Sequence, residues 1–195
     1  MNMNDRRLYR TCASDFQALQ RAAAPGEGIP LTVDGVCALL ERQRGIAIQR
    51  YPASLRGHPY GLVVRGKDLC IILYERHTSA WHQQGIILHE CGHIFYDHQG
   101  TEDGTAAALR MLVPDLPDED LHAVRHRAGG EEGHSPEDER QAEMFATVGL
   151  AWLSRAHTRP CGSSVAPAAP PPPDDPAVAA VVRRLMADFA GGEKP

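Results

Sequence analysis

Apolar residues recur at helical spacing in two stretches near the N-terminus. In residues 8–23, Phe16 and Leu19 fall three apart, and the alanine-rich end of the stretch precedes the helix-breaking pair Pro25-Gly26. A second set shares one helix face and comprises Val33, Val36, Cys37 and Leu40. Gly45, which tolerates the left-handed conformation of a helix end, follows that set. The pattern predicts two short helices.

The next segments carry the residue types of strands. Residues 45–51 alternate between apolar and polar positions, and residues 60–65 and 69–74 are rich in β-branched and aromatic side chains. Gly66-Lys67-Asp68 separates the last two runs. We expect a hairpin beside a preceding strand. Residues 69–74 are either an ordinary core strand or an edge strand on which an extended peptide aligns.

A long apolar segment follows, and Thr78 or Ser79 is available to cap it. In residues 80–98 apolar side chains cover most of the helix circumference, which is typical of a central, buried helix. Weaker patterns in residues 106–113 and 118–127 predict short helices. A clearer helix begins at Ser135 and continues to about residue 154, because a serine cap, a proline and an early acid complement free N–H groups.

Alanine and proline dominate the chain after Cys161, and this segment ends in consecutive prolines at 170–173. Such a sequence is extended and acts as a semi-rigid spacer. Beyond it, Asp175 and Pro176 begin an amphipathic helix that either folds back on its own domain or binds a partner. The expected organisation is an N-terminal helix and loop (1–30), a main α+β domain (31–158), a linker (159–176) and a C-terminal helix and tail (177–195).

Composition narrows the class of protein. The chain has 195 residues, of which 43% are hydrophobic, enough for the core of one domain. Its formal net charge of -5 is spread over interspersed acids and bases, so it lacks the cationic surface that direct nucleic acid binding requires. Five cysteines without a C-x-x-C pair argue against a disulfide framework and a thiolate zinc cluster. No signal sequence or run of ~20 apolar residues is seen, so we expect a cytoplasmic protein without membrane contact.

The predicted buried helix carries a pattern with metal chemistry. His89 and His93 are four residues apart, so both imidazoles project from one face and can reach one metal ion at about 2.0–2.1 Å. Glu90 lies roughly 100° round the helix, where it can take a proton from a metal-activated water. We expect one zinc ion per chain, with manganese and iron as alternatives, and peptide hydrolysis with Glu90 as general base and then acid.

A catalytic zinc site needs a third protein ligand and an open position. Glu139 and Glu143 lie four apart on one face of the helix that begins at Ser135, and either can reach the metal. The alternative is a pair of solvated acids on a helix surface. Spacing alone leaves this choice open.

Other polar residues near the motif are interpreted as structural. His82 and His98 are expected to be partly exposed residues near helix ends, too far along the axis to bind the same ion. Cys91 is turned roughly 200° from His89, so packing is expected rather than metal binding. The candidate donors for stabilising an oxyanion, among which the sequence does not choose, are Tyr60, Tyr74, His122 and His126.

Two motifs together resemble a known family. The run His89-Glu90-Cys91-Gly92-His93-Ile94-Phe95-Tyr96-Asp97-His98, followed by Glu139-Arg140-Gln141-Ala142-Glu143-Met144-Phe145-Ala146, is similar to the ImmA/IrrE metallopeptidases, which pair H-E-x-G-H with a later E-x-x-A-x-x-F-A helix. The resemblance covers roughly residues 31–155. Two departures are a longer separation between the motifs than in compact members and Gly149-Leu150-Ala151-Trp152 where the family usually has an L-L-M-P run.

The resemblance implies a fold, a ligand set and a partner. The fold is a zincin-like (gluzincin-like) α+β domain with a small sheet packed on the H-E-x-x-H helix, and Glu139 is the third zinc ligand beside His89 and His93. Members resemble regulators that act on helix-turn-helix repressors, by cutting them or by relieving the repression they impose. These regulators belong to phage, mobile-element, toxin–antitoxin and DNA-damage settings. Because no helix-turn-helix is identifiable in this chain, a separately encoded repressor is the expected substrate or partner. The alternatives are a regulator or toxin–antitoxin component that keeps the metal but acts by binding, and a purely structural zinc domain.

Overall fold

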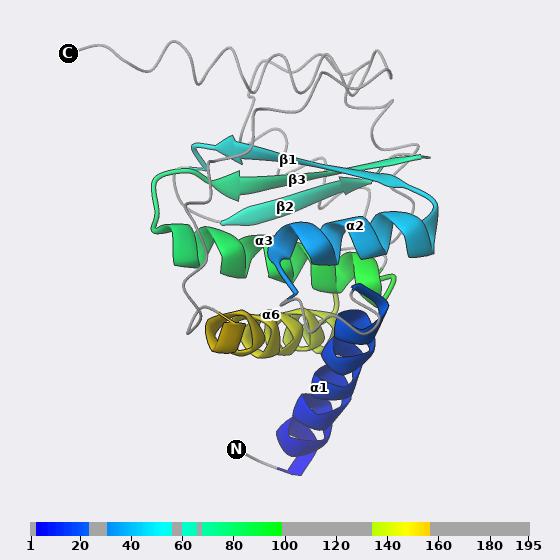
Figure 1. The fold of residues 1–195 in the computed structure, drawn as a ribbon. Coiled ribbons are helices and arrows are strands. Elements are labelled where there is room, and N and C mark those ends of the chain that lie inside the picture. The colour runs from blue at the N-terminus through cyan, green and yellow to red at the C-terminus, as the bar shows by residue number, and fades with distance from the viewer. Residues whose placement is uncertain (1–2, 24–30, 56–59, 66–67, 99–133, 157–195) are drawn as a thin grey trace, which may run out of the picture. The chain divides into compact units, whose positions relative to one another are not determined.

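The computed structural model describes residues 3–23, 31–55, 60–65, 68–98 and 134–156. These residues form four helices and one three-stranded mixed sheet, which confirms the α+β class (Figure 1). They divide into a helical unit and a sheet unit. The helices predicted in 106–113 and 118–127, the proline-rich linker and the C-terminal helix lie outside the described residues. Within the described part of the chain, no helix combines the length and apolar character that a membrane span requires.

The helical unit contains α1 (Met3–Ala23), α2 (Val33–Arg44), α3 (Ala80–Phe95) and α6 (Pro136–Ala156). Helix ends follow the predicted signals. Gly45 ends α2 in the left-handed conformation, with φ of 66°. At the start of α3, the Ser79 hydroxyl accepts the His82 N–H at 3.2 Å. Helix α1 begins at Met3, earlier than its apolar pattern indicates.

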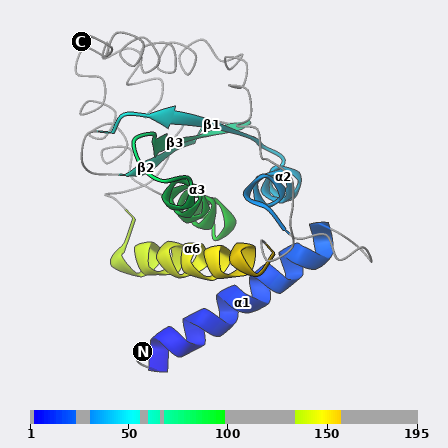
Figure 2. The same ribbon diagram turned by 60° about the vertical axis from the view of Figure 1, so that its left-hand side comes forward.

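Helix α6 lies between α3 and α1 in the helical unit (Figure 2). Phe16 of α1 and Phe145 of α6 are fully buried, and their ring centroids are 4.5 Å apart. Leu88 and Ile94 add the apolar face of α3 to this core. Each such side chain contributes about 1.5–3 kcal/mol when it is fully buried. Apolar packing therefore fixes how α6 lies against α3.

Polar contacts join α1 to the other helices. The Tyr96 hydroxyl, just beyond α3, donates to Asp15 Oδ2 at 2.7 Å and lies 3.3 Å from the Cys12 sulfur. Burial and these contacts raise the pKa of Tyr96 far above its ordinary value, so the phenol stays neutral and able to donate. Arg140 of α6 pairs with Asp5 of α1 at 3.0 Å. The N-terminal helix is therefore an integral part of the helical unit.

The sheet unit contains β1 (Ala47–Ala53), β2 (Gly61–Arg65) and β3 (Leu69–Glu75) in the order β1-β3-β2. Strands β2 and β3 form the predicted antiparallel hairpin, and β1 pairs with β3 in parallel. Since β3 is hydrogen-bonded on both sides, its backbone has no free edge for an added peptide. The edge-strand interpretation of residues 69–74 is therefore wrong, and the core-strand alternative holds.

The C-terminal end of α3 turns back on itself. Asp97 has a φ of 57°, the left-handed region that non-glycine residues rarely adopt. The Tyr96 N–H donates to the Gly92 carbonyl at 3.0 Å, and the His98 N–H donates to the His93 carbonyl at 2.9 Å. The second bond, which spans six residues from His93 to His98, is the 6→1 bond of a Schellman motif. The helix thus ends at Phe95, and His98 is brought back beside His93.

The left-handed conformation at residue 97 predicts different effects for two substitutions. Asp97→Val places a β-branched side chain where φ is positive. Asp97→Gly instead removes the Cβ, which at positive φ lies too close to the following carbonyl oxygen. Both variants lose the aspartate side chain, so their difference isolates the backbone. We expect the valine variant to be less stable than the glycine variant by about 1–2 kcal/mol. Urea denaturation measures this difference, and equal midpoints would contradict it.

Candidate metal centre

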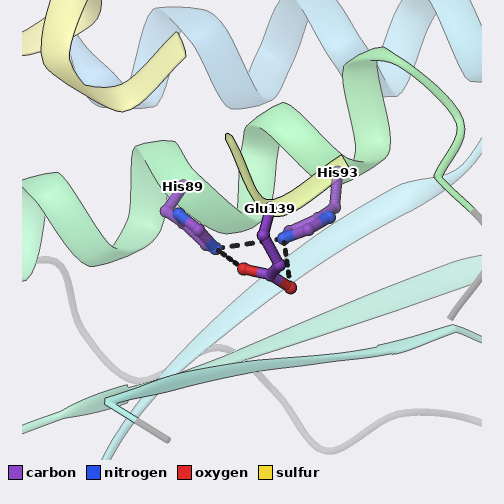
Figure 3. A group of neighbouring side chains, drawn as sticks. All are labelled: His89, His93 and Glu139. Atoms are coloured by element: carbon purple, nitrogen blue, oxygen red, sulfur yellow. Dashed lines mark hydrogen bonds and ion pairs between the residues drawn. The ribbon is translucent and has the colours of Figure 1, made fainter. Parts of the chain in front are cut away.

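Three side chains from two helices converge at one point (Figure 3). His89 and His93 come from successive turns of α3, and Glu139 comes from the first turns of α6. The two Nε2 atoms are 3.0 Å apart. Glu139 Oε2 lies 3.3 Å from His89 Nε2, and Glu139 Oε1 lies 3.6 Å from His93 Nε2. One potential ligand atom from each residue lies within 4.8 Å of the others, so the group could hold a metal ion.

The spacing of these atoms fits a divalent cation. Zinc bound in a tetrahedron at about 2.0–2.2 Å keeps its donor atoms roughly 3.3–3.6 Å apart. The separations of 3.3 and 3.6 Å, which involve different oxygens of Glu139, lie within that range, and the 3.0 Å between the two Nε2 atoms is slightly shorter. Two imidazole nitrogens and one carboxylate are also a donor set of catalytic zinc sites, which leave a fourth position open. Here the Glu139 side chain is 48% exposed and that of His93 is 2% exposed, so the group is buried on one side and accessible on the other.

A close contact between α3 and α6 brings Glu139 to the histidines. Gly92 lies between the two histidines in sequence, and a Cβ built on it would come within 3.0 Å of the Ala142 Cα and 3.3 Å of the Phe145 Cβ. Any side chain at Gly92 would therefore push α6 away. Ala142 is one turn beyond Glu139, so the contact fixes the position of the glutamate as well.

Acidic residues dominate the electrostatics of the group. Burial lowers the pKa of His89, but the hydrogen bond with Glu139 and the charges of Glu90, Glu139 and Glu143 outweigh it, and the net pKa is raised. The surroundings of His89 therefore favour a positive charge. Glu90 itself is buried, and its negative charge is one of those that raise the pKa of His89.

Glu139 and Glu143 approach different atoms of His89. Glu139 faces Nε2, the nitrogen that also lies beside His93, whereas Glu143 Oε2 lies 3.6 Å from Nδ1 on the other edge of the ring. Of the two acids that the spacing offered, the structure thus brings Glu139 into the group. Glu143 lies beside the Nδ1 edge of His89 at an ion-pair distance, on the side from which carboxylates orient histidine ligands in metal sites.

The other residues singled out from the sequence have different surroundings. His82 is exposed, as expected. Cys91 is buried with its sulfur 3.7 Å from that of Cys37 in α2, which agrees with packing. Tyr60 and Tyr74 belong to the sheet unit. His122 and His126 lie outside the described residues.

His98 lies near the end of α3, as expected, but the expectation that it is partly exposed is wrong. Its exposure is 6%, and its Nδ1 lies 3.1 Å from the Nδ1 of His93. The expectation assumed that the helix continues to His98, whereas the left-handed Asp97 turns the chain back. Asp138 and Gln141, which were not predicted to contact His98, approach its Nε2 at 3.4 and 3.1 Å. Their spacing of three residues on α6 was the available signal.

Comparison with known proteins adds no identification. A scan against protein-family models, a search of curated proteins and a search of solved structures each found no match.

The geometry predicts unequal effects for the two glutamates of α6. Glu139→Ala removes a donor atom, so zinc affinity should fall by more than the roughly 10–100-fold typical of residues that only orient a ligand. In Glu143→Ala the zinc affinity should fall by no more than about 10–100-fold, because water can replace the exposed carboxylate at His89 Nδ1. Elemental analysis of protein purified without chelators, together with competition against a chromophoric chelator, measures both, and His93→Ala serves as the positive control. Retained zinc in Glu139→Ala with loss in Glu143→Ala would reverse the assignment.

The contact at Gly92 predicts that one methyl group disturbs the centre. Gly92→Ala should destabilise the metal-free protein by roughly 1–3 kcal/mol, because the Cβ meets the α6 backbone, and should also weaken zinc binding. Gly85→Ala is the matched control on the same helix, since its Cβ would meet only the flexible end of Leu150 at 3.2 Å. That control should be neutral or slightly stabilising, as alanine favours helix by about 1 kcal/mol over glycine. Denaturation and zinc competition on both variants test this, and equal behaviour would contradict it.

Proposed function

We propose that this chain is a zinc-dependent endopeptidase with a zincin-like fold of the ImmA/IrrE type. The observation that carries the proposal is the convergence of His89, His93 and Glu139. Glu90, which follows His89 in the sequence, is buried. A structural zinc site is closed by four protein ligands, whereas the described residues bring three such side chains together. Three protein ligands with an accessible side are the arrangement of a catalytic site.

The residues divide the chemistry of peptide hydrolysis between them. Zinc, when bound, polarises a carbonyl group and makes water a nucleophile by lowering its pKa toward about 7. His89, His93 and Glu139 hold the ion. Glu90 accepts a proton from a water molecule while the oxygen of that water bonds to the peptide carbonyl carbon. Glu90 then delivers the proton to the peptide nitrogen as the C–N bond breaks. The negative surroundings of His89 favour retention of a cation through this cycle.

The substrate we propose is a regulatory protein, in particular a separately encoded helix-turn-helix repressor. This part of the proposal depends on the resemblance of the two motifs to the ImmA/IrrE metallopeptidases. It would make the chain a regulator of transcription, through cleavage of a phage, mobile-element, toxin–antitoxin or stress-response repressor. The second candidate function is that of a regulator that keeps the metal but acts by binding its partner. It differs from a peptidase in that it does not require Glu90.

Glu90→Gln tests catalysis separately from metal binding. The substitution keeps the size of the side chain but removes the base, so hydrolysis should slow by about 10²–10⁴-fold while zinc content stays at the wild-type level. A proteome-derived peptide library, analysed by mass spectrometry for new termini, provides a substrate mixture without knowledge of the natural one.

Controls make the outcome specific. Cleavage by the wild type should stop when a chelator removes zinc and return when zinc is added. His82→Phe, an exposed change on the same helix, should cleave like the wild type. Cleavage by Glu90→Gln at the wild-type rate would exclude the proposed mechanism, and zinc uptake without any cleavage would favour the binding alternative.

A further inference from the structure

His98 lies behind His93, on the side away from the three converging atoms. The His98 N–H donates to the His93 carbonyl, and the two rings are 5.1 Å apart at 72°. Their Nδ1 atoms are 3.1 Å apart, so one hydrogen is shared between them. The Nε2 of His93 faces the opposite way, toward His89 and Glu139. Which ring carries the shared hydrogen therefore determines what His93 presents to a metal ion.

The acceptor atoms around His98 determine which of the two rings carries the shared hydrogen. Its Nε2 lies 3.1 Å from Gln141 Oε1 and 3.4 Å from Asp138 Oδ1, and both atoms are acceptors. His98 must therefore carry its hydrogen on Nε2. In the neutral ring the Nδ1 is then an acceptor, and the shared hydrogen belongs to His93 Nδ1. The Nε2 of His93 consequently presents a lone pair, which is what a metal ion requires.

The carboxylate of Asp138 is itself held in place. Its Oδ2 accepts the Ser135 hydroxyl at 2.8 Å and the Ser135 N–H at 3.2 Å, in the cap at the start of α6. The same side chain directs Oδ1 toward His98. The cap, which fixes the start of α6, thereby supplies one end of the hydrogen-bonded chain.

From these contacts we infer that His98 is a positioning residue that fixes the tautomer and orientation of His93 through a chain from Asp138 and Gln141. The inference rests on the proposed metal site and extends it by a residue outside the ligand set. His93 and His98 are both buried, at 1% and 6% exposure, so water cannot readily replace His98 as the acceptor. Glu143, the corresponding partner of His89, is 75% exposed, and there water can take over. The two histidine ligands therefore depend unequally on their partners.

Substitutions at His98 separate the hydrogen bond from packing. His98→Phe keeps a ring but removes both nitrogens, and zinc affinity should fall by about 10–100-fold. His98→Asn offers an amide oxygen to accept the Nδ1–H of His93, so it should recover most of that affinity. His82→Phe makes the same change at an exposed histidine of α3 and should bind zinc like the wild type. The dissociation constant of Zn²⁺ is measured on the full chain by competition with a chromophoric chelator.

Nitrogen-15 NMR of the full-length, zinc-free wild type tests the tautomer directly. Long-range proton–nitrogen spectra, recorded above the titration range of free histidine, should show the His93 hydrogen on Nδ1 and the His98 hydrogen on Nε2. In His98→Phe, His93 should become a mixture of both tautomers. A merely structural role of His98 would change stability but not this signature.

Several results would overturn the inference. A wild-type His93 that carries its hydrogen on Nε2 would do so, as would a folded His98→Phe that binds zinc as tightly as the wild type. If His98→Phe does not fold, the inference is tested by the tautomer seen in the wild-type spectrum and by the zinc affinity of His98→Asn. A wild type that binds zinc with the expected tautomer but cleaves no peptide would overturn the proposed peptidase and support the role of His98. If the wild type takes up no zinc, the metal site fails, while the spectrum still decides the tautomer.

Discussion

The close approach of α3 and α6 at Gly92 and Ala142 is the constraint on which the candidate centre depends. Packed helices usually lie about 8–10 Å apart, at a distance set by the side chains between them. Here glycine and alanine meet, and a Cβ on Gly92 would lie 3.0 Å from the Ala142 backbone. Glu139, one turn before Ala142, is thereby carried to within 3.3 Å of His89. In the two motifs, two histidines and Glu139 form the candidate centre, and the glycine and alanine allow the close helix contact that lets them meet.

A second dependence links the start of α6 to the interior of the helical unit. Burying a polar group without a hydrogen bond costs roughly 1–3 kcal/mol in proteins, so the imidazoles of His93 and His98 need partners. Asp138 and Gln141 supply them from α6, and the Ser135 cap fixes Asp138 at 2.8 Å. A local signal, the serine before Pro136, thus acts beyond its own helix. Asp138 thus takes part in the cap at the start of α6 and also contacts the buried His98.

Local features of the sequence predicted much of the fold, and non-local pairing limited the rest. The start of α3, the end of α2 and the β2–β3 hairpin were predicted because capping residues and turn residues act on adjacent backbone. Whether β3 is central depends on pairing with β1, which no local pattern encodes. Spacing placed Glu139 and Glu143 on the same helix face, and the resemblance pointed to Glu139. In the structure the two acids are distinguished by the His89 atoms that they approach, Nε2 for Glu139 and Nδ1 for Glu143. His98 was misjudged because a positive φ at an aspartate cannot be read from apolar periodicity.

The hydrogen-bond directions show why this arrangement suits a cation. If His93 carries its hydrogen on Nδ1, and Glu143 favours the same for His89, both Nε2 atoms present lone pairs 3.0 Å apart. Glu139 adds carboxylate oxygens at 3.3 and 3.6 Å, so acceptors converge with no hydrogen among them. Such a group is repulsive until a positive species enters. The raised pKa of His89 shows that these acids favour positive charge at this point, because the Glu139 hydrogen bond and the nearby carboxylates outweigh the effect of burial. A divalent metal ion satisfies all three acceptors at once, whereas a proton satisfies fewer. The electrostatics of the metal-free centre therefore already favour the ion that the proposed chemistry needs.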